Sequence, residues 1–379
     1  MRAEAHEHGF TLAGACPAVT PAGASRLGEW LGRGYGGDMD YLAERQAAYE
    51  HPRHVLDGVR SILMLGMPYR TEEPRPVQPG QGRVSRYAWG PGDYHDLIHE
   101  RLKRLIAVLQ EAAPGAKARG VVDTAPLLER EFAQLAGLGW VGKHTLLINK
   151  PAGSYFFLAA LLTDQELAYD EPFTADHCGT CRACLDACPT NAFPQPYVLD
   201  ATRCISYLTI ELREAIPEDL RPGIGDWLFG CDVCQEICPW NQKPAPSPQP
   251  SPRGRGSDEP VLQPTTGTNP IDLIGLFDLD DEGFRERFRH TPLWRAKRRG
   301  ILRNAAIVLG NQRATAAIGV LTRGLDDAEP LVRGACAWAL AQIGSGEAAI
   351  ALSERLKVET DERVKRELAL AALVLSTEY

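Results

Sequence analysis

Cysteine is the residue whose spacing in this chain points most directly to chemistry. Eight of the ten cysteines fall into two groups. They read Cys178-x₂-Cys181-x₂-Cys184-x₃-Cys188-Pro189 and, after an isolated Cys204 and a long gap, Cys231-x₂-Cys234-x₃-Cys238-Pro239. In two-cluster ferredoxins with this spacing, three thiolates hold one four-iron cluster and the fourth cysteine ligates its neighbour. The chain is therefore predicted to carry electrons through two 4Fe–4S clusters.

The same rule assigns the ligands of each cluster. One cluster is expected on Cys178, Cys181, Cys184 and Cys238, and the other on Cys188, Cys204, Cys231 and Cys234. The second set departs from an ordinary tandem ferredoxin, because Cys204 stands far upstream of its partners. The alternatives are a zinc site, which rarely uses such a run, and disulfides, which need an oxidising compartment. Cys16 and Cys336 lie outside both groups.

Length and composition are those of an ordinary soluble protein with two or three domains. No apolar run is long enough to span a membrane, and the first residues contain no export signal. Together with reduced cysteines, these features predict a cytoplasmic protein with no membrane partner. The net charge of −8 is unevenly distributed, since residues 285–313 hold nine basic side chains and one acid, Glu286. A local basic patch is informative because screening limits charge effects to about 8–10 Å.

Hydrophobic patterns predict the elements that position these residues. Apolar runs rich in β-formers predict strands at Val59–Met67 and Ala118–Val122, and a strand or other buried segment at Tyr155–Leu162. Helical spacing predicts helices at Tyr94–Glu111, with Asp93 as its N-cap, and at Pro126–Leu138. Strands that alternate with helices favour an α/β layered structure.

The expected fold class is α+β and multidomain. It comprises an α/β domain at residues 1–175, a ferredoxin-like two-cluster module at 176–245, a Pro/Gly-rich linker at 246–284 and helical HEAT-like repeats at 285–379. The repeat rests on Glu329–Leu340 and Asp361–Ala372, which align with a period of 32 residues. A weaker echo occurs around Leu302–Ala306, and a generic helical bundle is the alternative.

Beyond its cysteines, the chain resembles the epoxyqueuosine reductases over nearly its whole length. The matching segments are Arg86-Tyr87-Ala88-Trp89-Gly90, Asp93-Tyr94-His95, Val122 to Arg130 (VDTAPLLER), Gly137 to Lys143 (GLGWVGK), Arg203 to Thr209 (RCISYLT) and Arg303-Asn304-Ala305. The resemblance implies a cobalamin-dependent iron–sulfur oxidoreductase. It would reduce epoxyqueuosine to queuosine at the wobble position of tRNA, the last step of queuosine biosynthesis.

Three details of the sequence bear on that resemblance. The family usually has Gly-Lys-Asn where this chain has Gly142-Lys143-His144, and VDTGP where Ala125 replaces the glycine. The corrinoid motif D-x-H-x-x-G is nearly present at Asp93-Tyr94-His95, but Ile98 stands in the glycine position. We therefore expect His95 to be a residue of the helix start, and the resemblance implies a corrinoid bound without a histidine ligand from this motif.

Asp123 is the residue that the resemblance favours as catalytic proton donor, beside the cofactor. Taken alone, it would be interpreted as a helix N-cap worth about 1 kcal/mol. It follows a predicted strand, and α/β proteins build sites at strand ends. An aspartic acid that donates a proton near neutral pH should have a pKa raised by burial. The further candidates for the corrinoid pocket are Tyr87, Lys143, Asn149 and Ser206.

The basic run predicts tRNA binding. A run of charge is usually a solvated helix face, but the excess of nine bases over one acid favours phosphate contacts. Trp294 could stack on a base of the single-stranded anticodon loop. The predicted contacts are Arg295, Lys297, Arg298, Arg299 and Arg303.

The expected partners are the anticodon stem-loop carrying epoxyqueuosine and a low-potential electron donor, with the chain as a monomer. Two other functions remain open. A reductive dehalogenase-like enzyme would share the cofactors but usually has an export signal and lacks a basic helical tail. A ferredoxin-type electron carrier would contain no corrinoid.

Overall fold

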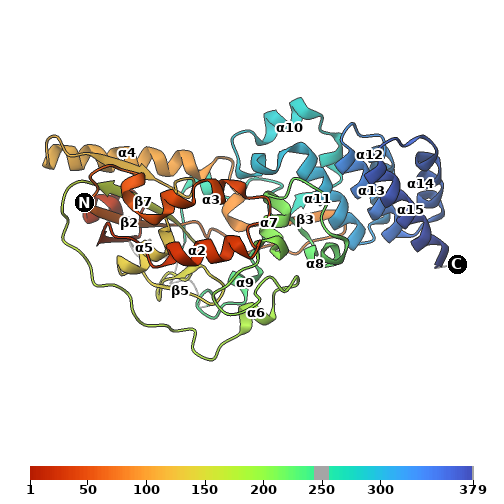
Figure 1. Cartoon of the computed structure of the whole chain (residues 1–379). Coiled ribbons are helices and arrows are strands. Elements are labelled where there is room, and N and C mark those ends of the chain that lie inside the picture. The colour runs from red at the N-terminus through yellow and green to blue at the C-terminus, as the bar shows by residue number, and fades with distance from the viewer. Residues whose placement is uncertain (243–255, 378–379) are drawn as a thin grey trace. The chain divides into compact units, whose positions relative to one another are not determined.

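The computed structural model describes residues 1–242 and 256–377 (Figure 1). The chain divides into two compact units. Unit 1 consists of Met1–Thr71, Gly92–Thr202 and Asp232–Gln263, and unit 2 consists of Glu72–Pro91, Arg203–Cys231 and Pro264–Tyr379. The units are therefore not the consecutive segments that the sequence suggested. In particular, the cysteine-rich segment contributes to both, because a strand inside it, Trp227–Phe229, pairs with the Gln81–Val84 strand of unit 2.

Unit 1 contains a four-stranded sheet in the order β1 (Leu12–Pro17), β2 (Ser61–Pro68), β7 (Phe156–Thr163) and β4 (Ala118–Val121). All neighbouring strands are antiparallel. Every residue of β2 is buried, as its continuous apolar pattern predicts for a central strand. Both strands predicted in this region are thus confirmed, and the buried segment predicted at Tyr155–Leu162 forms a third, β7.

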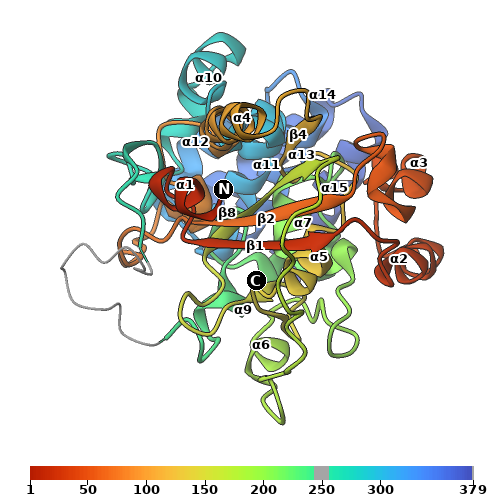
Figure 2. The ribbon, with the colours of Figure 1, turned by 90° about the vertical axis from the view of Figure 1, so that its left-hand side faces the viewer.

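The two main helices of unit 1 cover opposite faces of this sheet (Figure 2). Helix α4 (Tyr94–Ala112) begins where predicted, and the Asp93 carboxylate accepts a hydrogen bond from the His95 amide as its N-cap. Helix α5 (Glu129–Leu135) packs its Phe132 on the opposite face, among the buried residues Ile62 and Leu162. It begins three residues later than predicted, because the segment before it forms tight turns.

Unit 1 also contains short elements, two of which carry motif cysteines. A hairpin joins β5 (Trp140–Val141) to β6 (Leu147–Ile148), and the one-turn helices α6 (Ala183–Asp186) and α9 (Val233–Glu236) lie in the cysteine segments. The remaining helices of the unit are α1 (Arg2–Glu7), α2 (Gly23–Gly32) and α3 (Asp40–Glu44).

Unit 2 combines a small sheet with a stack of helices. Strand β3 (Gln81–Val84) pairs in parallel with β8 (Trp227–Phe229) and antiparallel with β9 (Ile271–Asp272). The helices are α7 (Ile205–Ile210), α8 (Arg221–Ile224), α10 (Asp281–Phe288), α11 (Lys297–Asn311), α12 (Ile318–Gly324), α13 (Pro330–Ile343), α14 (Gly346–Val358) and α15 (Glu362–Thr377). The two segments aligned at a period of 32 residues lie in α13 and α15, so the predicted helical repeat is confirmed at this level.

Part of the predicted linker is folded. Residues 246–255 lie outside the described residues, but residues 256–284 bury Leu262, Ile271, Leu273 and Leu276. The segment also supplies β9, which pairs with β3. The prediction of a linker was wrong for this part, because the apolar residues that follow the Pro/Ser/Gly run are enough to anchor it.

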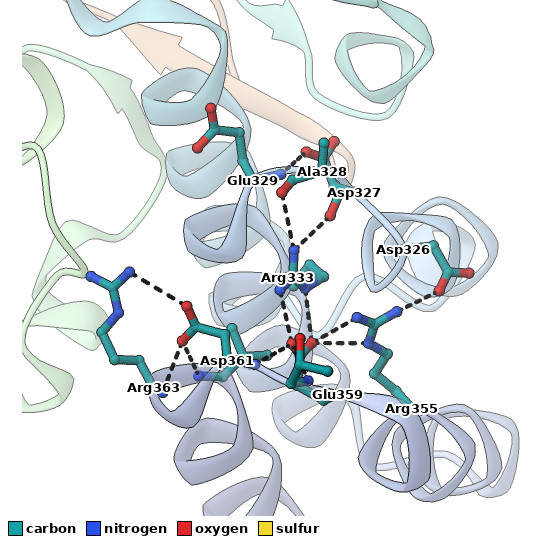
Figure 3. A network of polar contacts seen from close by, with 11 residues as sticks. Asp326, Asp327, Ala328, Glu329, Arg333, Arg355, Glu359, Asp361 and Arg363 are labelled. Atoms are coloured by element: carbon teal, nitrogen blue, oxygen red, sulfur yellow. Dashed lines mark hydrogen bonds and ion pairs between the residues drawn. The ribbon is translucent and has the colours of Figure 1, made fainter.

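The helical repeats enclose a buried ion pair (Figure 3). Arg333, from α13, donates to both oxygens of Glu359 over 2.8 Å, and the Glu359 side chain is 0% exposed. Arg355 also donates to Glu359, as do the backbone amides of Thr360 and Asp361. These donors, the Arg333 guanidinium first, hold the pKa of Glu359 far below its ordinary value. The carboxylate therefore joins α13 to the end of α14.

Among the helices in the described part of the chain, none combines the length and apolarity needed to cross a membrane.

Candidate active site

Four cysteines of unit 1 surround one cavity, which we call the cluster cavity. It has a volume of about 280 Å³, and its walls include Cys178, Cys181, Cys184 and Cys238. These are the four residues that the sequence assigns to the first cluster. Burial, together with the neighbouring Cys238, Cys178 and Cys181 thiols, raises the pKa of Cys184 to about 11. Gathered thiols of this kind need cationic iron to become thiolates, so the donor set fits a 4Fe–4S cluster.

The β5–β6 hairpin forms part of the wall of the cluster cavity. The Lys143 ammonium group donates to the carbonyl oxygens of Gly179 and Cys181, over 2.6 and 2.8 Å. The next residue, His144, is 3% exposed and also lines the cavity. Burial and the nearby Arg130 lower the pKa of His144 to about 4, so its ring is neutral. Lys143 thus holds in place the loop that contains Cys181, a predicted cluster ligand.

The four remaining motif cysteines are divided between the units. Cys188 and Cys234 belong to unit 1, and Cys204 and Cys231 belong to unit 2. Within unit 2, Cys204 is the N-cap residue of α7, and Cys231 follows β8. Asn304 of α11 ties these two segments together, since its amide donates to the carbonyls of Thr209 in α7 and Leu228 in β8. Their assignment to the second cluster stays a prediction.

The two cysteines outside the motifs are core residues. Cys16 is fully buried, and burial, reinforced by Asp170, raises the pKa of its thiol to about 12. Cys336 is also fully buried, and burial raises its pKa well above the ordinary value. All ten cysteines are free of disulfides.

Asp123 lies in a second constellation of unit 1, at the end of β4. His95 Nε2 lies 2.8 Å from Asp123 Oδ1, and the Tyr94 hydroxyl donates to Oδ2 over 2.5 Å. The other ring nitrogen of His95 lies 2.5 Å from Asp93 Oδ1. Helix α5 begins at Glu129 without a side-chain cap, so Asp123 does not serve as the N-cap that was its alternative role. Its side chain is 44% exposed and can meet a substrate.

The protonation of this constellation differs from the expectation. Burial alone would raise the pKa of Asp123, but the hydrogen bond and charge of His95 and the Tyr94 hydroxyl outweigh it and lower the pKa. Burial disfavours the charged form of His95, yet the Asp123 and Asp93 carboxylates raise its pKa to about 10. The expected raised pKa of Asp123 was therefore wrong for this arrangement. At neutral pH the proton resides on His95, between two carboxylates.

Aromatic rings fix the geometry around Asp123. Tyr94 stacks on His95 and on Phe157 of β7, with ring centroids 4.1 Å apart in both pairs. Phe157 in turn contacts Tyr69, whose hydroxyl lies 3.4 Å from Gln235 Oε1. Gln235 is the neighbour of Cys234 in α9. The sequence could not predict this row of contacts from Tyr94 to Gln235, because its members come from four separate segments of the chain.

The other candidates for the corrinoid pocket have varied surroundings. The Asn149 side chain donates to Leu138 and accepts from Ala152, so it organises its own loop. Lys143 is held at the cluster loop, as described above. In unit 2, Tyr87 lies 6.3 Å from the Phe229 ring, and Ser206 is half-buried in α7. All four roles remain predictions, and the contacts of Asn149 and Lys143 favour structural ones.

The predicted tRNA-binding residues separate into two groups. Arg303 is 1% exposed and donates to the carbonyls of Leu208, Leu212 and Glu214. Its guanidinium group is therefore not available to phosphates, and the prediction that it binds tRNA was wrong. Arg298 is largely buried and makes a two-pronged ion pair with Asp327. Both residues are structural, because their guanidinium groups turn toward the protein, where Arg303 donates to backbone carbonyls and Arg298 to a carboxylate.

Arg295, Lys297 and Arg299 are exposed. They lie with Arg213, a residue that the sequence reasoning missed, and we call these four residues the basic cluster. Arg213 donates to the Arg295 carbonyl over 2.9 Å. Burial, together with the charges of Arg213 and Arg295, lowers the pKa of Lys297. Lys297 also has a φ of 60°, a strained conformation for a residue with a side chain.

The cluster cavity, the His95–Asp123 pair, the helical repeat and the basic cluster together indicate an iron–sulfur oxidoreductase. Family models match residues 50–124 (epoxyqueuosine reductase QueG, DUF1730), 177–241 (4Fe-4S double cluster binding domain) and 295–372 (HEAT repeats). The chain is 43% identical to the epoxyqueuosine reductase of Pseudomonas aeruginosa, over 82% of this chain and 84% of that protein. It is 39% identical to that of Escherichia coli, over 89% and 86%.

A solved structure of an epoxyqueuosine reductase with an epoxyqueuosine-modified stem loop of tyrosine tRNA matches with a TM-score of 0.89. It shares 30% identity and covers 99% of this chain and 97% of that one. The chain belongs to the epoxyqueuosine reductase family, and its activity is that of this oxidoreductase. The dehalogenase-like and electron-carrier alternatives are accordingly set aside.

Epoxyqueuosine reductases use 4Fe–4S clusters and cobalamin. The contacts of His95 leave it no ring nitrogen to offer to the cobalt of a corrinoid, because both ring nitrogens are engaged by carboxylates. This agrees with the incomplete corrinoid motif in the sequence.

Proposed function

We propose that Asp123 and His95 together supply one of the two protons that epoxide reduction consumes, and that the basic cluster of unit 2 binds the substrate tRNA. Removal of the epoxide oxygen as water leaves a carbon–carbon double bond and requires two electrons and two protons. The clusters deliver electrons singly, and bound cobalamin supplies a centre able to hold two at once. The side chains must therefore provide and position the protons.

The proposal for proton supply rests on the contact between His95 Nε2 and Asp123 Oδ1, which lie 2.8 Å apart. The pair holds one proton at neutral pH, and Asp123 is the more exposed partner. As negative charge develops on the departing oxygen, the Nε2 proton of the His95 imidazolium passes to Asp123, which delivers it to that oxygen and leaves His95 as a neutral imidazole. Tyr94 orients the carboxylate by donating to its other oxygen.

The test is anaerobic turnover of an epoxyqueuosine-containing anticodon stem-loop by the Asp123→Asn variant, followed by nucleoside analysis. The asparagine keeps the shape but cannot relay a proton. Activity should fall by about 10²–10⁴-fold, the usual contribution of general-acid catalysis. Iron and cobalamin contents should match the wild type. A rate near that of the wild type in a fully loaded variant would remove Asp123 from the mechanism.

The proposal that tRNA binds to unit 2 rests on the positive charges gathered in the basic cluster. Together with burial, the charges of Arg213 and Arg295 lower the pKa of Lys297, and those of Arg295 and Arg299 act in the same way on Arg213. Glu211, which pairs with Arg295 and lies 3.9 Å from Arg213, neutralises only part of this charge. Arg213 and Arg299 also line a cavity of about 120 Å³ with Glu214 and Glu329. Phosphates relieve such repulsion, and tRNA is a polyanion. We expect the substrate to be the anticodon stem-loop, the chain to act as a monomer in the cytoplasm, and the electrons to come from a low-potential donor.

A further inference from the structure

His144 is a buried histidine with one ring nitrogen unaccounted for. The residue is 3% exposed, and its Nδ1 accepts a hydrogen bond from the Leu146 amide over 3.2 Å. Because Nδ1 is an acceptor, the hydrogen of the neutral ring lies on Nε2. Within the described residues, Nε2 has no hydrogen-bond partner. Leaving a buried N–H unpaired is costly, so this donor calls for a partner other than the protein.

The position of the His144 ring is fixed by the hairpin that carries it. The Gly142 amide donates to the Leu146 carbonyl and the Thr145 amide to the Gly142 carbonyl, both over 2.8 Å. A side chain at Gly142 would approach His144 Cε1 to 3.0 Å, so the ring fills the space beside this glycine. Lys143 fastens the same hairpin to the carbonyls of the Cys178–Cys184 loop. The ring consequently has little freedom to seek another partner.

His144 is one of the residues that line the cluster cavity, together with the four cysteines assigned to the first cluster. We propose that His144 donates a hydrogen bond from Nε2 to a sulfur atom of that cluster and thereby raises its reduction potential. The inference rests on the assignment of those four cysteines. Reduction adds negative charge to the cluster, so a fixed donor to its sulfur stabilises the reduced form more than the oxidised form.

The residue at this position distinguishes the chain from the pattern usual in its family, which has asparagine. An asparagine oxygen can accept from the amide two residues on, as Nδ1 of His144 does. Its side chain is too short to place a donor where Nε2 lies. His144→Asn should therefore preserve the hairpin and remove the donor to the cluster. His144→Gln has a longer side chain, so its amide N–H can approach the Nε2 position.

The experiment is a potentiometric titration of the fully loaded enzyme followed by electron paramagnetic resonance. A hydrogen bond to a charged group changes an equilibrium roughly tenfold. In His144→Asn, the ratio of reduced to oxidised first cluster at fixed potential should fall about tenfold, which is about 59 mV for a one-electron couple. The midpoint of the second cluster should not move, and His144→Gln should recover most of the shift. Iron content must equal that of the wild type in each variant.

His177 provides a matched control, because it lines the same cavity but is exposed to solvent. His177→Asn should shift the midpoint much less than His144→Asn. With ¹⁵N-histidine, pulsed spectroscopy of the reduced enzyme should detect a ring nitrogen coupled to the cluster that disappears in His144→Asn. Unchanged midpoints in His144→Asn, or equal shifts in the two variants, would overturn the proposal. Loss of iron from the Cys181 variant is a separate matter and tests the ligand assignment alone.

Discussion

His95 Nε2 lies 2.8 Å from Asp123 Oδ1, and the same ring is held from its other side by Asp93. An imidazole between two carboxylates keeps its proton far above the ordinary pKa of 6.5. This arrangement lets a carboxylate of low pKa take part in proton donation at neutral pH. The proton is stored on the histidine, and Asp123 presents it to the substrate.

The stored proton predicts the pH dependence of the reaction. The pKa of His95 is raised to about 10, so the pair remains protonated as pH rises through neutrality and loses its proton near pH 10. In His95→Gln, the decline of kcat/KM with rising pH should begin several units lower, because Asp123 must then hold the proton alone. Asp93→Asn is the control: asparagine still caps α4, one carboxylate on His95 is lost, and the shift should be smaller. Identical profiles for the wild type and His95→Gln would exclude the stored proton.

The same shifts have a consequence for stability. Because the folded pKa of His95 is raised, its contribution is fully present below pH 6.5 and is lost as pH rises through about 10. The pKa of Asp123 is lowered, so its contribution is present above 3.8 and is lost as pH falls further. Hydrogen exchange at the start of α4 should therefore be measured from pH 4 to pH 10. Protection should be greatest between about pH 4 and 6.5, where both contributions are present, and should decline toward pH 10. His95→Gln should flatten that profile.

Iron content tests the cluster assignment. Two four-iron clusters predict about eight irons per chain. Replacement of Cys181 with serine should reduce the iron content and abolish turnover, because Cys181 lines the cluster cavity. Replacement of Cys16 with alanine should leave iron unchanged, since this thiol lies in the core of the sheet. Full retention of iron in single variants of Cys178, Cys181 and Cys184 would contradict the assignment.

Salt-dependent binding tests the basic cluster. We would combine Lys297→Gly with Arg299→Gln and leave Arg298 and Arg303 intact, because these two are structural. Each lost phosphate contact should reduce the salt slope of tRNA binding by somewhat less than one unit. Glycine accepts the φ of 60° at position 297 without strain, so stability should not fall. Exposed Arg313, outside the cluster, is the control position. If affinity and slope both stay at wild-type values, the basic cluster is only a solvated surface.

Glu359 should be the most sensitive charged position in the helical repeats. Its buried carboxylate accepts from Arg333, and removal of one partner from such a pair costs about 3–5 kcal/mol. Glu359→Gln should accelerate hydrogen exchange throughout α14 and α15. The exposed Glu362, paired with Lys365, is the control, and its change to glutamine should cost no more than about 0.5 kcal/mol. Because the pKa of Glu359 is lowered, the wild-type advantage is complete above pH 4.5 and disappears as pH falls below it.

Sequence alone determined the features that depend on neighbouring residues. Cluster chemistry follows from cysteines spaced within a few residues, because one short loop wraps a single cube of iron and sulfide. The central strand β2 and the amphipathic helix α4 follow from hydrophobic periods of similar range. Asp93 was likewise identified as an N-cap, since capping involves the next two or three residues. These interactions need no knowledge of the rest of the fold.

Only the tertiary structure separated the polar residues that are candidates for catalysis or binding from those that only stabilise the fold. Asp123 and His95 are 28 residues apart, and the charge of the histidine reverses the expected shift in the aspartate pKa. Arg213 joins the basic cluster through Arg295, 82 residues away, whereas Arg303 from the same basic run is buried. The unpaired nitrogen of His144 becomes visible only once its neighbours are placed. Burial and electrostatics depend on groups that meet through folding, and a linear pattern records neither.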